Sequence, residues 1–180
     1  MDTLLCLDFL EFSAFPSGTV YKILKNSYSL YPTLSIKDSE WLRLDTDIYS
    51  DRTSDLEGFI AAVQNEPIGV ILWQLDKDGE NAILLECSVS LLHQRKGYGS
   101  LMMQEAINRL ASMGVKSIFA KTYQRLEYAT RLLDKHNFAF VRLCRDNDLS
   151  LCLGVGVNYQ HIIGKKLPRP KKLRKKWKIF

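Results

Sequence analysis

Three runs of β-forming residues lie close together in the chain, at Phe59–Val63, Ile68–Trp73 and Ala82–Val89. Asn65-Glu66-Pro67 joins the first run to the second, and Asp76–Gly79 lies between the second and the third. Turn residues of this kind between short apolar runs predict an antiparallel meander. The connections are too short for the helical crossovers that parallel neighbours need, so this part of the chain is not a doubly wound sheet.

Helical patterns flank the meander on both sides. Apolar residues three or four apart predict a helix before it, a weaker second one, and a long helix from Gly97 that stops at Gly114. The expected fold is α+β in the order β-α-α-β-β-β-α-β-α-β-β, with a mixed, mostly antiparallel central sheet flanked by helices. Outside the meander we expect strands at Leu4–Leu10, Lys116–Tyr123, Phe138–Leu143 and Leu149–Val155, helices at Val20–Tyr28, Asp38–Leu44 and Arg125–His136, and a loop at Ile48–Glu57.

Composition limits the class of protein. The chain has 180 residues, 46% of them hydrophobic and 25% charged, which suits one ordinary globular domain. No apolar run approaches the about 20 residues that a membrane span requires, so no membrane partner is expected. The four cysteines form no CxxC pair and stand apart from the three histidines, so neither a metal site nor a disulfide framework is indicated. Free buried thiols fit a reducing compartment, and we expect a cytoplasmic protein.

Basic residues are concentrated in the last part of the sequence. Lys165–Phe180 holds nine of the 25 basic residues and no acidic one, which leaves 16 basic against 20 acidic residues elsewhere. We therefore divide the chain into a single domain at 1–160 and a basic C-terminal tail at 161–180. The segment Lys165–Lys178 is a candidate for binding nucleic acid, a ribosomal surface or acidic lipid. The alternative is a solvated terminus that contributes only to solubility.

The segment after the third β run, Gln94-Arg95-Lys96-Gly97-Tyr98-Gly99, opens the long helix. Two glycines at a helix start let the backbone approach a bulky anion, and the free N–H groups and macrodipole of the first turn attract it. Arg95 and Lys96 add positive charge, so a pyrophosphate fits. Neither GxGxxG nor GxxxxGK[ST] occurs in the chain, which argues against dinucleotide-binding and P-loop sites.

Gln94, Gly97 and Gly99 match Q/R-x-x-G-x-G/A, the motif that follows the fourth strand in the GCN5-related N-acetyltransferase (GNAT) superfamily. The chain resembles this family from about Gly58 to Leu143. The alternative is an ordinary glycine-containing loop before a core helix. The resemblance implies that the fourth and fifth strands splay apart and that acetyl-CoA lies in the gap. The cofactor-binding residues it implies are Val89, Leu91, Gln94, Arg95, Lys96, Gly97, Tyr98, Gly99 and Ser100.

Glu86 is the candidate general base. The family's reaction brings an amine to a thioester, and an ammonium with a pKa of about 10 must first lose a proton. Glu86 is an acid in an otherwise apolar strand beside the expected splay, where burial favours proton uptake. The alternative is that Glu86 faces solvent on the polar side of its strand. We interpret Cys87 as a buried structural thiol rather than a covalent nucleophile.

A general acid is harder to place. The tyrosine that many family members carry in the fourth helix corresponds to Leu133 here, and Tyr128, five residues earlier, is expected to point elsewhere. Tyr123, at the end of the fifth expected strand, is the remaining candidate. Water is the alternative, because a thiol with a pKa of about 8.5 leaves readily as a thiolate.

Two functions follow from these interpretations. The first is acetyl-CoA-dependent N-acetyl transfer to a primary amine of a small molecule or protein, by direct attack in a ternary complex. The second is a CoA-binding module without catalysis, tethered to nucleic acid by its basic tail. Neither the acceptor nor the oligomeric state follows from the sequence.

Overall fold

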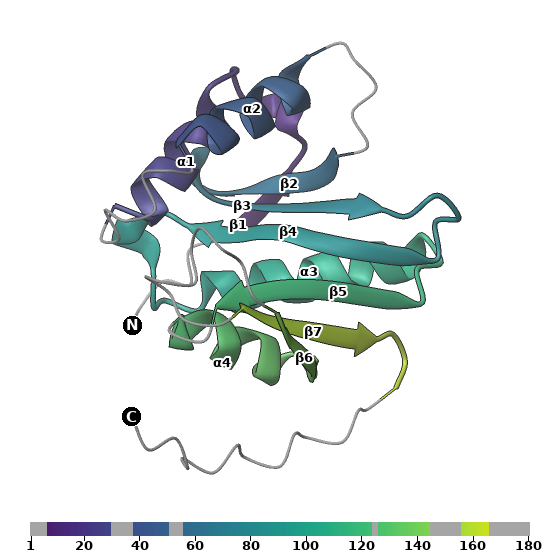
Figure 1. Cartoon of the computed structure of the whole chain (residues 1–180). Coiled ribbons are helices and arrows are strands. Elements are labelled where there is room, and N and C mark those ends of the chain that lie inside the picture. The colour runs from purple at the N-terminus through teal and green to yellow at the C-terminus, as the bar shows by residue number, and fades with distance from the viewer. Residues whose placement is uncertain (1–6, 30–37, 51–55, 124–125, 145–155, 166–180) are drawn as a thin grey trace.

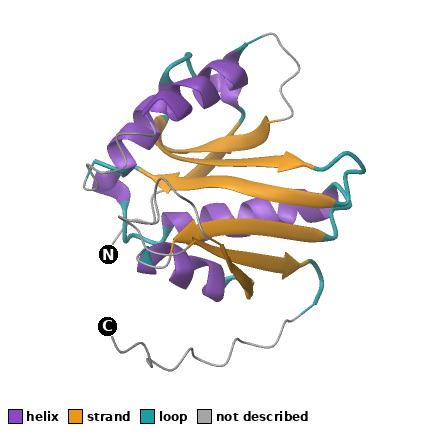
Figure 2. Ribbon diagram, in the orientation of Figure 1, coloured by secondary structure: helices purple, strands orange, loops and turns teal. Residues whose placement is uncertain are grey.

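A seven-stranded sheet with helices on both faces forms the body of the protein (Figure 1, Figure 2). The computed structural model describes residues 7–29, 38–50, 56–123, 126–144 and 156–165. The strand order is β1-β2-β3-β4-β5-β7-β6, and all neighbours are antiparallel except β4 and β5. The elements are β1 (Leu7–Leu10), η1 (Phe12–Ala14), α1 (Thr19–Ser27), α2 (Asp38–Tyr49), β2 (Leu56–Val63), β3 (Glu66–Leu75), β4 (Asn81–Val89), η3 (Leu91–His93), α3 (Tyr98–Ser112), β5 (Ser117–Tyr123), α4 (Glu127–Lys135), β6 (Ala139–Cys144) and β7 (Gly156–Ile162).

The predicted α+β architecture is confirmed, including the β2–β3–β4 meander and the long helix after it. The loop predicted at Ile48–Glu57 is wrong at both ends, because α2 continues to Tyr49 and β2 already begins at Leu56. The first predicted strand corresponds to β1, while its residues 4–6 lie outside the described part of the chain. Among the described residues, no helix combines the length and apolar character needed to cross a membrane.

The last described strand is β7, which follows the predicted segment Leu149–Val155; that segment lies outside the described residues. β7 lies between β5 and β6 in the sheet, and Tyr159 and His161 turn toward the core. Asn158 and Gln160, which alternate with them, are polar, and this weakens the hydrophobic signal of a strand that is nevertheless paired on both sides. Because β7 continues to Ile162, the sheet extends past residue 160, where the sequence placed the domain boundary.

The sheet separates two hydrophobic clusters. One lies under α3 and the other under α1 and α2, so each face of the sheet is covered by its own helices. Alternation along β3 serves both clusters, since Ile71 and Trp73 face α3 while Val70 and Leu72 face α1. Helix α3 contributes Met102, Met103, Ala106 and Leu110 to the first cluster, and α1 contributes Val20, Ile23 and Leu24 to the second.

The N-terminus of α1 is capped from α2. Its N-cap residue is Gly18, which has no side chain to bind the first-turn amides. Asp45, buried in α2, accepts hydrogen bonds from the backbone N–H of Gly18 at 2.8 Å and of Tyr21 at 3.0 Å. The carboxylate supplies partners to amides that have none within the helix and also opposes the positive end of its dipole. The two helices are thereby joined as one unit.

A β-bulge in β4 decides which side chains reach which face. Consecutive residues of β3 pair with Leu84 and with Glu86, so Leu85 is an extra residue without a partner in β3. One extra residue shifts the period-2 alternation of a strand by one position. Leu84 and Cys87 therefore both belong to the cluster under α3, while Glu86 faces α1.

Candidate active site

Strands β4 and β5 separate partway along their length. Their parallel pairing runs from Asn81–Ser117 to Leu84–Ala120, and no later pair joins the described residues of the two strands. The outer neighbours stay attached, because β3 pairs with β4 as far as Val89 and β7 pairs with β5 as far as Tyr123. The splay that the sequence resemblance implied near Val89 is therefore present, and it begins at Leu85.

A cavity of about 140 Å³ lies at this separation. Its wall is mostly apolar, and among the described residues that line it only Glu86 and Lys121 carry a charge. The cavity is therefore a weakly polar space with one carboxylate. The lining residues are Tyr28 directly after α1, Leu84–Cys87 of β4, Met103 of α3, Ala120–Tyr123 of β5, Leu126, and Tyr128, Ala129, Leu132 and Leu133 of α4.

The carboxylate of Glu86 is held in the cavity by two hydroxyl groups. Its Oε1 atom accepts a hydrogen bond from the Tyr28 hydroxyl and another from the Ser88 hydroxyl, both at 2.7 Å. Glu86 is half-buried and faces α1 because of the bulge at Leu85. The sequence allowed Glu86 either to lie beside the splay or to face solvent. In the structure its side chain lines the cavity at the splay.

Tyr28 is a site residue that the sequence did not single out. Its ring stacks on that of Trp41, with centroids 5.2 Å apart and planes 13° apart. Burial, and after it the negative charge of Glu86, raises the pKa of the Tyr28 hydroxyl well above its usual value. The hydroxyl therefore remains protonated and donates to Glu86 throughout the neutral range. In the sequence, Tyr28 stands at the end of an apolar helical stripe, and that position indicated only a core residue.

Three residues were considered for the role of general acid, and all of them line the cavity: Tyr123, Tyr128 and Leu133. Tyr123 is buried, with the Nζ atom of Lys121 5.6 Å from its ring centroid, and Leu133 is buried as well. The expectation that Tyr128 points elsewhere is wrong. Residues 128, 129, 132 and 133 form one face of α4, and Tyr128 and Leu133 occupy its two borders. Two tyrosines besides Tyr28 therefore line the cavity, Tyr123 and Tyr128.

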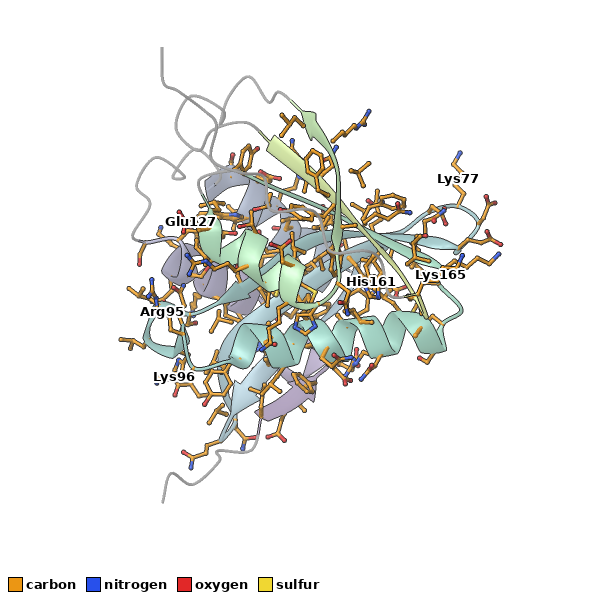
Figure 3. All side chains as sticks on the ribbon, turned by 90° about the horizontal axis from the view of Figure 1, so that it is seen from below. Lys77, Arg95, Lys96, Glu127, His161 and Lys165 are labelled. Atoms are coloured by element: carbon orange, nitrogen blue, oxygen red, sulfur yellow. The ribbon has the colours of Figure 1, made fainter. Side chains whose placement is uncertain are left out.

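Helix α3 begins directly after the glycine-containing loop. Gly97 is its N-cap residue with φ of +89°, a left-handed conformation that glycine adopts without strain, and no side chain caps the first turn. Arg95 and Lys96 are exposed on this loop at the outer edge of the molecule (Figure 3). Free amides, the helix dipole and two cations together form an anion-binding arrangement.

The side chain of Gln94 is engaged within the protein. Its Nε2 atom donates to the carbonyl oxygens of Ser27 at 3.1 Å and Val89 at 2.9 Å, and the N–H of Leu91 donates to Asn26 Oδ1 at 2.7 Å. These bonds fix the end of α1 to the segment between β4 and α3. Gln94, Val89 and Leu91 thus each have one polar group with a protein partner, and their assignment to the cofactor stays a prediction.

Ser100 and Tyr98, also assigned to the cofactor, direct their side chains toward other protein groups. The Ser100 hydroxyl lies 2.9 Å from Nε2 of His136 at the end of α4, and burial lowers the pKa of that histidine. The Tyr98 ring lies 6.3 Å from that of His93. Within the described ranges no three His, Cys, Asp or Glu side chains gather as metal ligands. The backbone N–H groups are therefore the candidate anion ligands in the first turn of α3.

Cys87 packs against α3, with its Sγ atom 4.0 Å from the carbonyl oxygen of Gly99. Burial, together with the charge of Glu86, raises the pKa of the Cys87 thiol to about 12. We expect native Cys87 to react with iodoacetamide at pH 8 about a thousandfold more slowly than an ordinary thiol, because the thiolate is the reactive species. Peptide mapping of protein labelled before and after denaturation measures the difference. Equal labelling in the two states would contradict the buried-thiol interpretation.

The model of the Acetyltransferase (GNAT) family matches residues 19–138 of the chain. The match covers more than half of the sequence and includes the meander, the splayed strands, the glycine-containing loop and α4. The chain belongs to the GNAT acetyltransferase family.

Solved structures show the same fold at low sequence identity. An acetyltransferase from Thermus thermophilus is 19% identical with a TM-score of 0.63, covering 89% of this chain and 99% of that chain. The ribosomal-protein-S18-alanine N-acetyltransferase of Escherichia coli is 15% identical with a TM-score of 0.67, covering 91% and 98%. The PaiA N-acetyltransferase of Thermoplasma acidophilum, solved with coenzyme A, is 15% identical with a TM-score of 0.67, covering 87% and 99%. A search of curated protein sequences finds no match.

Proposed function

We propose that the protein is an N-acetyltransferase that moves an acetyl group from acetyl-CoA to a primary amine by direct attack in a ternary complex. The observation that carries the proposal is the separation of β4 from β5 with the carboxylate of Glu86 inside it. Family membership supports acyl transfer, and the relative solved with coenzyme A supports the identity of the donor. The uncapped start of α3, with Arg95 and Lys96 beside it, suits the pyrophosphate.

Glu86 is assigned the role of general base. In the reaction the amine nitrogen attacks the thioester carbonyl carbon, the carbon–sulfur bond breaks, and the nitrogen gives up a proton. Glu86 receives that proton directly or through one water molecule. Because Tyr28 and Ser88 both donate to Oε1, we assign proton acceptance to Oε2.

The departing sulfur requires a proton to complete the reaction. Tyr123 and Tyr128 line the same cavity as Glu86 and are the candidates to supply it. A thiol of ordinary pKa, about 8.5, leaves readily as the thiolate, so water can also complete the step. The buried Leu133 has no hydroxyl and takes no part in proton transfer.

A thermal-shift experiment with acetyl-CoA tests the proposal first. At 100 times its dissociation constant, a ligand that binds only the folded state raises the free energy of unfolding by about 2.7 kcal/mol. We expect an increase of this size with acetyl-CoA, and a smaller one in the R95A/K96A double variant. Lys77→Ala is the matched control, because Lys77 is also exposed but lies on the turn between β3 and β4 (Figure 3). The absence of a shift with any acyl-CoA would reject the proposal.

A CoA-binding module without catalysis is the second candidate, and the buried Leu133 at the expected tyrosine position favours it. Binding of acetyl-CoA with no thiol release across a library of amines would support this alternative. Nucleic-acid binding by Lys165–Lys178 stays a prediction, since all but the first of these residues lie outside the described part of the chain. The cytoplasmic location likewise stays a prediction.

A further inference from the structure

An exposed apolar strip runs along the sheet beside the cavity. Ile83 and Phe119 are paired neighbours on β4 and β5, and they are 47% and 37% exposed; Leu85, at the cavity itself, is 40% exposed. Ile83 and Phe119 lie on the face opposite α3, since the residues beside them in each strand belong to the cluster under that helix. In Figure 1, α3 passes behind β5 and no described helix passes in front of it.

The same face leads to the Glu86 carboxylate. Residues two apart in a strand share a face, so Phe119, Lys121 and Tyr123 form a row that ends at the cavity. Glu86 also turns to this face because of the bulge. An amine that reaches Glu86 from this side therefore passes over an apolar surface that is wider than one side chain.

The charges at the cavity limit the kind of amine that fits. Of the described lining residues, one is a carboxylate, Glu86, and one is an ammonium, Lys121. A polyamine or an aminoglycoside carries several ammonium groups, and Glu86, the one carboxylate among the described lining residues, can pair with only one of them. An acceptor with one amine matches this single carboxylate.

The pKa of the amine also favours an acceptor with one α-amino group. A peptide α-amine has a pKa of about 7.7–8.0, whereas a lysine side chain has one of about 10.4. A substantial share of the α-amine is therefore already neutral at pH 7.5, and far less help is required from a single carboxylate.

We infer that the acceptor is the α-amino group of a peptide whose first side chains are apolar, which would pack on Ile83, Leu85 and Phe119. This inference rests on the proposed N-acetyl transfer and specifies its substrate class. The peptide N-terminus places its amine at Glu86 and its apolar side chains on the strip.

An acceptor panel followed by thiol release from acetyl-CoA at pH 7.5 tests the inference. The panel contains a peptide that begins Met-Leu-Phe without lysine, the same peptide with a blocked α-amine and one added lysine, phenylalaninamide, spermidine and an aminoglycoside. We expect kcat/KM for the free Met-Leu-Phe peptide to exceed that for every other acceptor by at least about tenfold. A higher value for spermidine, the aminoglycoside or the lysine ε-amine would overturn the inference. An equal value for phenylalaninamide would overturn the peptide part of it.

Variants on the strip give a second measurement. Ile83→Ser and Phe119→Ser should each raise the KM for the peptide about tenfold and leave the KM for acetyl-CoA unchanged. Met113→Ser is the matched control, because Met113 is 45% exposed but follows α3. Unchanged peptide KM in both strip variants would contradict the inference.

The two proposals fail in different ways. If acetyl-CoA raises the unfolding temperature but no panel member is acetylated, the acceptor inference is wrong while CoA binding stands. If acetyl-CoA does not bind, the proposed function itself is wrong.

Discussion

Glu86→Gln should lower kcat by about two to four orders of magnitude, the usual contribution of a general base. The glutamine amide has nearly the same shape, and its oxygen can still accept hydrogen bonds from Tyr28 and Ser88. It cannot take up a proton from the attacking amine, so the loss falls on turnover. Steady-state thiol release with an accepted amine measures kcat, and the thermal shift with acetyl-CoA should stay close to that of the unaltered protein.

Ser88→Ala is the control for this first variant. It removes one of the two hydrogen bonds to Oε1 but leaves the carboxylate in place, so we expect a loss in kcat of only about tenfold. A kcat for Glu86→Gln within about threefold of the unaltered protein would show that Glu86 is not the base. The proton would then have to leave through water alone.

Gly58→Ala should reduce the free energy of unfolding by about 3 kcal/mol or more, or abolish the cooperative transition. Gly58 lies in β2 with φ of +153°, and a Cβ atom there would sit 2.0 Å from the carbonyl oxygen of Ile71. It would also lie 3.0 Å from the carbonyl carbon of that residue. Both are backbone atoms of the paired strand β3, so no side-chain rotation relieves the clash. Urea denaturation followed by circular dichroism measures the loss.

Gly79→Ala separates this clash from the general cost of a glycine conformation. Gly79 has φ of +69°, but a Cβ atom there would meet nothing within 4 Å. Its substitution should therefore cost only the about 1–2 kcal/mol of placing an L-residue in the left-handed region. If the two variants lose equal stability, the close approach of β2 to β3 is not what requires Gly58.

The parts of the fold that were predicted from the sequence are those with a local signal. The meander and α3 have clear periodicity and turn residues, and the glycine-containing loop marks the start of α3. Asp45 had no such signal, because it caps a helix 27 residues earlier in the chain and only the packing of α2 on α1 brings it there. The hydrogen bond between Tyr28 and Glu86 spans 58 residues and was hidden for the same reason.

The motif located the loop before α3 but not the direction of its side chains. Gln94 matched the pattern and was assigned to the cofactor, yet its amide holds Ser27 and Val89. A spacing rule fixes the positions of residues along the backbone, whereas the partner of a side chain depends on neighbours from elsewhere in the chain. The same holds for Tyr128. Its position around the helix axis relative to Leu133 did not by itself reveal that both residues border the face of α4 that lines the cavity.

The unpaired residue Leu85 makes the number of residues in β4 as important as their identity. A bulge bends its strand, and the pairing of β4 with β5 stops at Leu84, directly before the extra residue. Deleting Leu85 would leave Glu86 opposite Leu72, so the carboxylate would keep its face of the sheet. The bend would be lost, however, and Glu86 would then be the next residue to pair with β5. Its partner would be Lys121, which follows Ala120 in the parallel ladder. Among relatives of this chain, a β4 that is one residue shorter at this point should therefore keep the carboxylate but close the space beside it.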